Sequence, residues 1–292
     1  MKHAYLITAN ANWNIIRMCL QMLDQNGTDF FLLIDRKIKS PLKELMNIKL
    51  SKSQLIELPR MEINWGGYSQ IQAEINLLRT AIKGNYDYYH FLQGSDLPIK
   101  SKEEINCFFE KNRGTEFIQF TPSQYEFAKW KCCYYHILVE NRFYRNCKLM
   151  RGINHVAVAI QRKLNLQRKQ PKLFHGSALF SITHDCATYI LQEEAVIKGT
   201  FSRTCAADEV FLQTMIMQSP FADKIFHFES ADGHARYIDW EHRNGNSPKT
   251  LTEDDFQLLM ELPEQYCFAR KITDSNIGLA EKIANELKDR EV

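Results

Sequence analysis

Two adjacent carboxylates, Asp208 and Glu209, stand at the start of a predicted helix and are well suited to acid–base chemistry. Val210, Thr214 and Met217 are spaced to share one face of that helix, which therefore has a side to bury. Acidic side chains in a first turn also stabilise a helix through its dipole, so the pair by itself could be purely structural. A catalytic role for Glu209 depends on the rest of the chain.

The composition narrows the class of protein. The 292 residues are 45% hydrophobic and 25% charged, enough for one sizeable core, and a net charge of +2 gives no reason to expect a nucleic-acid partner. The eight cysteines are scattered without a CxxC pair, which predicts reduced thiols and no zinc site. No apolar run approaches the roughly 18 residues of a membrane-spanning helix. A soluble, cytoplasmic, bacterial protein is expected.

Strands and helices alternate through the first part of the chain. Strands are expected at 4–9, 30–34, 54–58, 88–92 and 116–120, and helices at 13–23, 69–82 and from 101 onward. This order predicts an α/β fold with a mostly parallel sheet flanked by helices. Ligands of such sheets bind beyond the carboxyl ends of the strands, which places Asn10, Asp35 and the turn at 94–96 on one edge. Ser69 and Gln72 predict a capping box for the helix at 69–82, and Ser101 with Glu104 predicts a cap for the helix that begins at 101.

The second part is less regular. Helices are expected at 152–164, 184–194, from 252 and at 276–287, and strands at 178–182, 225–228, 236–238 and 267–269. The basic run at 161–172 is either a solvated loop or a contact to an anionic membrane surface or an acidic glycan. No repeat or linker is evident, so a single compact domain is predicted.

Two turns could face a ligand. Trp65, Gly66 and Gly67 precede the helix at 69–82 and form either a tight loop or a glycine-lined wall beside a sugar, with Trp65 as an apolar face. Asp96 follows a buried strand, where aspartate is also a common turn residue. Enzymes that hold a divalent metal on a diphosphate often use Asp-x-Asp in such a turn, and no two aspartates here are two positions apart. No metal site is therefore predicted.

Basic and aromatic side chains gather in two later segments. Arg270 and Lys271 directly follow an apolar strand, where cations can clamp phosphates as a metal would, or form a surface charge pair. Arg236, Tyr237 and Trp240 combine a cation with rings that could stack on a sugar, or form a strand edge. A further segment, Gly176 and Ser177 before a strand, predicts a plain turn or a ligand contact.

Nine segments, taken together and in order, resemble the Core-2/I-branching family of inverting glycosyltransferases, which includes the peptide O-xylosyltransferases. They are AYLITA (4–9), FFLLIDRK (30–37), WGGYSQIQAEINLL (65–78), DYYHFLQGSDLPIKS (87–101), HGSALFSIT (175–183), AADEVFLQTM (206–215), RYIDW (236–240), SPKTLT (247–252) and CFARKI (267–272). The resemblance implies a GT-A-like fold for residues 1–292. It implies a nucleotide-sugar-binding half at 1–120, an acceptor-binding and catalytic half at 121–275, and a C-terminal helix at 276–292.

The resemblance also implies a UDP-sugar donor, most often UDP-N-acetylglucosamine, a glycan acceptor, inversion at the anomeric carbon and no metal. Glu209 falls on the family's catalytic base. The diphosphate would be bound by Arg270 and Lys271, with Arg236 as a looser match. Candidate donor contacts are Asn10, Asp35, Trp65, Gly66, Gly67 and Asp96. Candidate acceptor contacts are Gly176, Ser177, Tyr237, Trp240, Asp208 and Lys129.

The chain departs from the family in three ways. Asn10 stands where many relatives have histidine. No membrane anchor or disulfide framework of the eukaryotic members is evident. The region 124–172, where relatives bind acceptor, aligns poorly, so Lys129, Trp130 and Lys131 are assigned by position only. Transfer of xylose, glucose or galactose remains an alternative, as does a non-catalytic module that binds glycans or nucleotides. The expected acceptor is a surface polysaccharide or lipopolysaccharide under assembly, including lipid-linked forms reached through peripheral membrane contact at 161–172.

Overall fold

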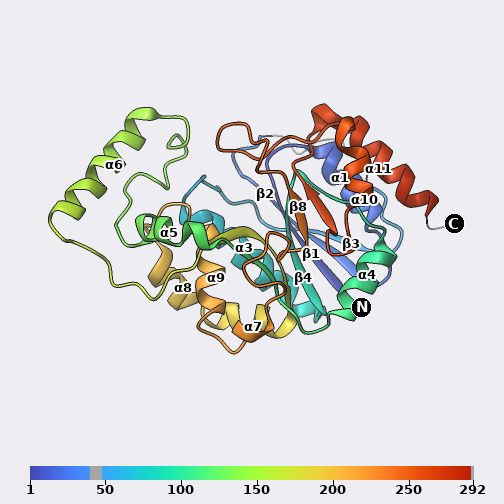
Figure 1. Ribbon diagram of the computed structural model, residues 1–292, viewed down its shortest axis with the longest axis horizontal. Coiled ribbons are helices and arrows are strands. Elements are labelled where there is room, and N and C mark those ends of the chain that lie inside the picture. Colours follow the sequence, from blue (N-terminus) through green and yellow to red (C-terminus); the bar gives the residue numbers. More distant parts are fainter. Residues whose placement is uncertain (40–47, 291–292) are drawn as a thin grey trace.

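The computed structural model describes residues 1–39 and 48–290, and its centre is a six-stranded sheet (Figure 1). The strands, in spatial order, are β3 (Gln54–Glu57), β2 (Thr28–Ile34), β1 (His3–Ala9), β4 (Tyr88–Gln93), β7 (Gly176–Thr183) and β6 (Phe117–Phe120). The first four are parallel, whereas β7 runs antiparallel to both of its neighbours. The predicted α/β class is confirmed, with a sheet that is mixed at one side.

A second, three-stranded sheet brings distant segments together. Its order is β5 (Asp96–Pro98), β9 (Phe268–Arg270), β8 (Arg236–Ile238), with β9 antiparallel to β5 and parallel to β8. Residues 96–98 were predicted as part of a turn; they form a strand because they pair with β9, far along the chain. The strand predicted at 225–228 is wrong, since Ile225 makes only an isolated bridge to Glu116.

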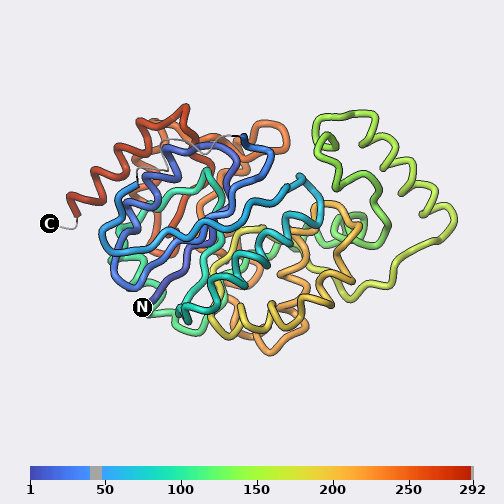
Figure 2. The backbone as a smooth tube through the Cα atoms, turned by 180° about the vertical axis from the view of Figure 1, so that it is seen from behind, coloured from blue at the N-terminus to red at the C-terminus, as the bar shows by residue number. Residues whose placement is uncertain are grey.

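Helices cover both faces of the six-stranded sheet. Ala4 and Leu6 of β1 face a core built with α3 (Tyr68–Ala81), α7 (His184–Gln192), α8 (Glu194–Phe201) and α9 (Phe211–Ile216). Tyr5 and Ile7 face the opposite core, built with α1 (Trp13–Met22), α4 (Lys102–Lys111), α10 (Phe256–Glu261) and α11 (Ile277–Asp289). Figure 2, the view from behind, shows the face of the sheet that α3 covers. Successive side chains of a strand point to opposite faces, so burial on both sides follows from the largely apolar strand sequences.

Two predicted helix starts had different outcomes. The capping box of Ser101 and Glu104 at α4 is present. The one predicted from Ser69 and Gln72 is wrong: α3 begins at Tyr68, and the Ser69 hydroxyl accepts from the Asn64 amide instead. The helix predicted around Asp208 divides into a 3₁₀ turn, Ala207–Glu209, and α9.

A lobe beside the sheet carries α5 (Tyr125–Cys132) and α6 (Lys148–Lys163), and α6 projects away from the rest of the molecule (Figure 1). At the other end, α11 confirms the predicted C-terminal helix up to Asp289, and residues 291–292 lie outside the described part. The division into a donor half and an acceptor half stays a prediction. No helix among the described residues is both long enough and apolar enough to span a bilayer.

Candidate active site

The carboxyl ends of β1, β2 and β4 meet at one edge of the sheet, as expected from their order. The Asp35 amide donates to Ala9 O over 3.0 Å, and the Gly94 amide donates to Thr8 O over 3.1 Å. Asn10 is exposed at this edge. Asp35, in contrast, is buried and lies 3.1 Å from the Lys37 ammonium, while its other oxygen accepts from the Lys37 amide. The edge thus offers Asn10 to a ligand more openly than Asp35.

Asp96 and Arg270 form a buried ion pair at the same edge. The Arg270 Nη1 atom donates to Asp96 Oδ1 over 2.6 Å, and Nη2 donates to the Gln93 side chain. The second Asp96 oxygen accepts from the Gln93 amide. The Asp96 side chain is fully buried, whereas Arg270 is 18% exposed. Asp96 therefore positions Arg270, and its two oxygens are already bonded within the protein, so the predicted donor contact of Asp96 stays a prediction.

Lys271 lies in a group of cations. Burial lowers the pKa of Lys271, and the nearby charges of Arg270 and Arg145 lower it further. Arg145, from the loop between α5 and α6, also stacks over the Trp65 ring at 5.8 Å. Three neighbouring cations form a place where an anion is stabilised. Arg145 was not among the predicted site residues.

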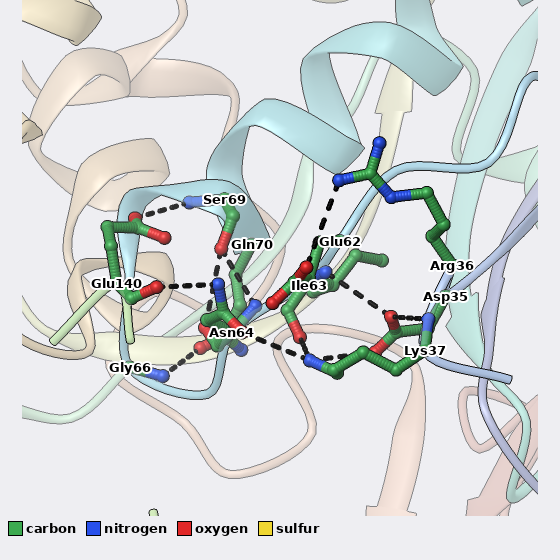
Figure 3. Close-up of polar contacts among 10 residues, drawn as sticks. All are labelled: Asp35, Arg36, Lys37, Glu62, Ile63, Asn64, Gly66, Ser69, Gln70 and Glu140. Atoms are coloured by element: carbon green, nitrogen blue, oxygen red, sulfur yellow. Dashed lines mark hydrogen bonds and ion pairs between the residues drawn. The ribbon is translucent and has the colours of Figure 1, made fainter. Parts of the chain in front are cut away.

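The loop that contains Gly66 is flanked by Asn64 and Ser69, and Glu140, far away in sequence, bonds to both of them (Figure 3). The Ser69 amide at the start of α3 donates to Glu140 Oε1 over 2.9 Å. A Cβ atom on Gly67 would lie 2.6 Å from that carboxylate, so the second glycine makes room for Glu140. Gly66 has a φ of +79° and its carbonyl accepts from the Ala206 amide over 2.7 Å. The two glycines therefore allow Glu140 and the backbone of Ala206 to approach this loop closely, and Trp65 beside them is exposed.

Glu209 lies within reach of two basic side chains. The ammonium of buried Lys131 donates to Glu209 Oε2, and His175 Nε2 lies 3.4 Å from the same oxygen. Burial raises the pKa of Glu209, but the His175 hydrogen bond and the Lys131 charge outweigh it and hold that pKa below its usual range. The side chain is still 41% exposed, so an ionised carboxylate faces a space that substrate could enter.

Asp208 turns the other way, into the protein. Its Oδ2 atom accepts from the Gln70 side chain over 2.8 Å, and the residue is buried. Burial raises the pKa of Asp208, and the Glu209 charge adds to the effect. Behind it, fully buried Glu74 has its pKa raised well above the usual value by burial and by Asp208. For Asp208 these contacts favour the structural alternative over the predicted acceptor contact, because the carboxylate is buried and bonded to Gln70.

Arg236 is packed in the core and does not join Arg270 and Lys271. Its guanidinium donates to the Phe180 carbonyl over 2.7 Å, to the Ser181 hydroxyl over 2.9 Å and to the Phe91 carbonyl over 3.3 Å. It is 1% exposed, and burial lowers its pKa to about 10. The structure therefore contradicts the predicted diphosphate contact at Arg236, because these bonds fix the side chain between β4 and β7.

Gly176 and Ser177 are in contact with other groups of the protein itself. A Cβ atom on Gly176 would lie 1.8 Å from the Gln119 carbonyl oxygen, at the point where the pairing of β6 with β7 shifts register. The Ser177 hydroxyl accepts from the Leu179 amide over 3.1 Å, and its carbonyl accepts from Gln213. These contacts explain why a small residue stands here; neither residue is shown to face a ligand.

The remaining acceptor candidates differ in accessibility. Trp240 is exposed, just after β8, at the end of the small sheet where Lys271 follows β9. Tyr237 is partly buried against Tyr266. Lys129 is exposed and lies 2.7 Å from Glu126, while its neighbour Lys131 is the residue that reaches Glu209. Of the three residues at 129–131, only Lys131 contacts the proposed base.

The structure adds two residues to the site, His175 and Arg145, and it gives Lys131, which the sequence assigned by position only, a contact with Glu209. His175 begins the segment 175–183 that resembles the family, but no sequence feature predicted its contact with Glu209. In the described ranges, no group of three or more His, Cys, Asp or Glu side chains is arranged to hold a metal ion.

Comparisons of the chain with known proteins identify its family. The chain matches the Core-2/I-Branching enzyme family over residues 3–260. Xylosyltransferase 2 of Rattus norvegicus is 21% identical over 266 residues, covering 83% of this chain and 28% of the relative. A Homo sapiens beta-1,3-galactosyl-O-glycosyl-glycoprotein beta-1,6-N-acetylglucosaminyltransferase is 24% identical over 262 residues, covering 84% of this chain and 56% of the relative. The chain thus spans only part of the length of both relatives.

Among solved structures, apo mouse Xyloside xylosyltransferase 1 aligns over 92% of this chain and 96% of its own. Its sequence identity is 10% and its TM-score 0.43, too low to support a conclusion. The family match, together with the mixed α/β sheet, confirms the predicted GT-A-like class. The chain belongs to the Core-2/I-branching enzyme family of glycosyltransferases.

Proposed function

We propose that this protein transfers a sugar from a UDP-sugar to a hydroxyl group of a glycan, with inversion and without a metal ion. One observation carries the proposal: the turn of Trp65 and Gly66 contacts both the segment that carries the proposed base and one member of the cation group. The Gly66 carbonyl accepts from the Ala206 amide, three residues before Glu209. Arg145 stacks on the Trp65 ring and acts electrostatically on Lys271. A carboxylate and phosphate-binding cations connected to one turn with an exposed aromatic ring suit a sugar nucleotide.

The transfer requires a base that removes the proton of the acceptor hydroxyl and cations that stabilise the departing UDP. The acceptor oxygen forms a bond to the anomeric carbon while the bond from that carbon to the diphosphate oxygen breaks. Glu209 takes the hydroxyl proton, and for this its carboxylate must come within about 2.6–3.2 Å of the acceptor oxygen. Lys131 and His175 hold Glu209 through Oε2 and keep it ionised. UDP leaves as an anion, and Arg270, Lys271 and Arg145 stabilise its developing charge in place of a metal.

The donor is proposed to be UDP-N-acetylglucosamine. The human relative is named for N-acetylglucosamine transfer, whereas the rat relative is named for xylose transfer. The acceptor is proposed to be a bacterial surface polysaccharide or lipopolysaccharide, including lipid-linked intermediates. The protein is then cytoplasmic and meets the inner face of the membrane at 161–172, where four basic residues are exposed: Arg162, Lys163, Lys169 and Lys172.

A donor titration tests the proposal. UDP-N-acetylglucosamine, UDP-xylose, UDP-glucose, UDP-galactose and UDP are each titrated while the melting temperature is recorded, and the donors are then assayed for UDP release. One UDP-sugar should raise the melting temperature and release UDP, because a ligand that binds only the folded state stabilises it. Binding without any UDP release, with or without glycan acceptors, would instead indicate a non-catalytic module. No effect of any UDP compound would refute the nucleotide site.

A further inference from the structure

The segment 141–184 is basic without any counter-charge. It holds nine Lys and Arg residues and no Asp or Glu, although the whole chain is almost neutral at +2, so the rest of the protein is net negative. The nine are Arg142, Arg145, Lys148, Arg151, Arg162, Lys163, Arg168, Lys169 and Lys172. Such separation of charge in one lobe favours an anionic partner over a neutral one.

The same lobe exposes most of the large apolar side chains that the described residues leave open to solvent. Sixteen such side chains are exposed, and ten of them lie between residues 135 and 166. On α6 they form one stripe at helical spacing: Leu149, Ile153, Val156 and Ile160, with Leu164 continuing it. Leu149 is 72% exposed and Val156 60%. The stripe is an unpartnered face rather than a set of scattered residues.

The opposite face of α6 is firmly attached, so the stripe is presented on a fixed helix. Asn154 is fully buried and donates to His136 over 3.0 Å and to the Tyr144 hydroxyl over 3.1 Å. Its side-chain oxygen accepts from the Ile137 amide. Val158 is buried one turn later. The outward stripe is therefore not needed to hold α6 in place, and Figure 1 shows the helix at the outer end of the molecule.

Charge and shape together identify the partner. An apolar stripe edged by Lys and Arg is the pattern of a helix that lies in the interface of an anionic membrane. A symmetric contact between two copies would set this basic face against itself, and like charges repel. Nucleic acid would leave the aliphatic stripe exposed. We propose that α6 and the basic run after it dock the protein on an anionic lipid bilayer, with the stripe inserted among the acyl chains.

A basic groove is lined by the segment that follows α6, and its cations could bind lipid headgroups. It has a volume of about 690 Å³ and is bordered by α5 and by the segment after α6. Lys129, Arg168, Lys169 and Lys172 line it, against one acid, Glu126. Docking through this lobe would also hold the site near the membrane, because the lobe supplies Lys131 and Arg145. The docking deepens the membrane contact that the proposed function includes but is argued from the exposed apolar stripe and the charges alone; the last consequence also rests on the proposed sugar transfer.

Co-sedimentation with vesicles tests the docking without any sugar donor. The full chain is mixed with phosphatidylcholine vesicles that do or do not contain phosphatidylglycerol. We expect binding to the anionic vesicles and little to the neutral ones. One triple variant removes the stripe: Ile153→Gln, Val156→Gln and Ile160→Gln. It should lower partitioning about tenfold or more, since both apolar burial and charge contribute. Glutamine is a good helix former, and circular dichroism confirms that the helices remain.

Matched controls separate the stripe from general changes in surface. An apolar control carries Val196→Gln, Phe228→Gln and Leu258→Gln, which are exposed elsewhere. It should bind vesicles as the wild type does. A charge variant with Arg162→Gln, Lys163→Gln and Lys169→Gln should lose the preference for anionic vesicles. Its control, with Lys52→Gln, Lys83→Gln and Lys198→Gln, should keep it.

Three results would overturn the proposal. The wild type could remain in the supernatant with anionic vesicles. The stripe variant could bind as strongly as its control. The stripe variant could instead change only the molar mass measured by light scattering, which would make the stripe a contact between copies. Loss of UDP-sugar turnover with vesicle binding intact would refute the proposed function and leave the docking standing.

Discussion

Arg270 and Asp96 pair across the small sheet, with the guanidinium Nη1 2.6 Å from the carboxylate Oδ1 and the two residues opposite each other in the β5–β9 register. One partner is fully buried and the other is partly exposed at the edge where ligands are expected. This pair fixes the direction of a cation that the sequence marked as a phosphate ligand. Its carboxylate half was expected to touch the donor directly.

Replacing Asp96 should therefore cost both stability and donor binding. Asp96→Ala leaves Arg270 without its buried partner, and we expect the free energy of unfolding to fall by about 3 kcal/mol. UDP should bind more weakly because Arg270 is no longer held. Urea unfolding and calorimetric titration measure the two effects. The exposed pair Lys111 and Glu264, 2.9 Å apart, gives the control: Lys111→Ala should change stability by at most about 1 kcal/mol. Equal effects of the two variants would show that the buried pair has no special role.

Arg145 should contribute to diphosphate binding although it lies in the lobe assigned to the acceptor. Arg145→Gln is expected to weaken UDP binding about fivefold, a modest loss because the side chain is exposed and its charge is screened. The neighbouring Arg142→Gln removes another exposed cation, which stacks on Phe143, and should leave UDP affinity unchanged. If both variants weaken UDP equally, Arg145 acts only through general charge.

Glu209→Gln should retain UDP binding and lose about 10²–10⁴ in turnover, the usual contribution of a general base. Lys131 provides a second test through pH. Because the Lys131 charge helps hold the pKa of Glu209 down, Lys131→Gln should move the acid limb of the kcat/KM profile to higher pH. Lys129→Gln, which removes a cation paired with Glu126, should leave the limb in place. A wild-type turnover for Glu209→Gln, or an unmoved limb for Lys131→Gln, would exclude these roles.

Glu74 should make stability depend on pH. Burial raises its pKa far above the ordinary value, so the folded state keeps a proton that the unfolded state releases. The stabilising contribution is present below the unfolded pKa and is lost as pH rises toward the folded one. Glu74→Gln cannot titrate, so its advantage over the wild type should grow by up to about 1.4 kcal/mol per pH unit above roughly pH 4.5. Urea unfolding at several pH values measures it, and parallel pH curves would contradict it.

Turnover should survive EDTA. Asp96 is already occupied by Arg270, and the cation group is proposed to do electrostatically what a divalent ion does in Asp-x-Asp enzymes. The assay compares UDP release before and after dialysis against EDTA, and again after manganese is added. Loss of activity that manganese restores would show that a metal is required and that the cation group is insufficient.

The sequence predicted the features that depend on local pattern. The strands at 4–9, 30–34 and 88–92, and the shared edge at which they end, follow from apolar runs and from the order of elements. The Ser101–Glu104 cap follows from spacing alone. The Ser69–Gln72 cap fails because Glu140, from another segment, supplies the acceptor at the start of α3. A pattern four residues long cannot show a partner seventy-one positions away.

By itself, then, the sequence determined the α/β class, the family and a short set of charged residues near strand and helix ends, because burial and backbone spacing are local properties. Only the tertiary structure decided what each charge faces. In the folded protein, Glu209 contacts Lys131 and His175, and Asp96 pairs with Arg270. Arg236 is bonded between two strands, and Arg145 lies near enough to Lys271 to affect its pKa. The physical reason is that the pairing of charges depends on distance in space, which is set by how the chain packs and not by separation along it.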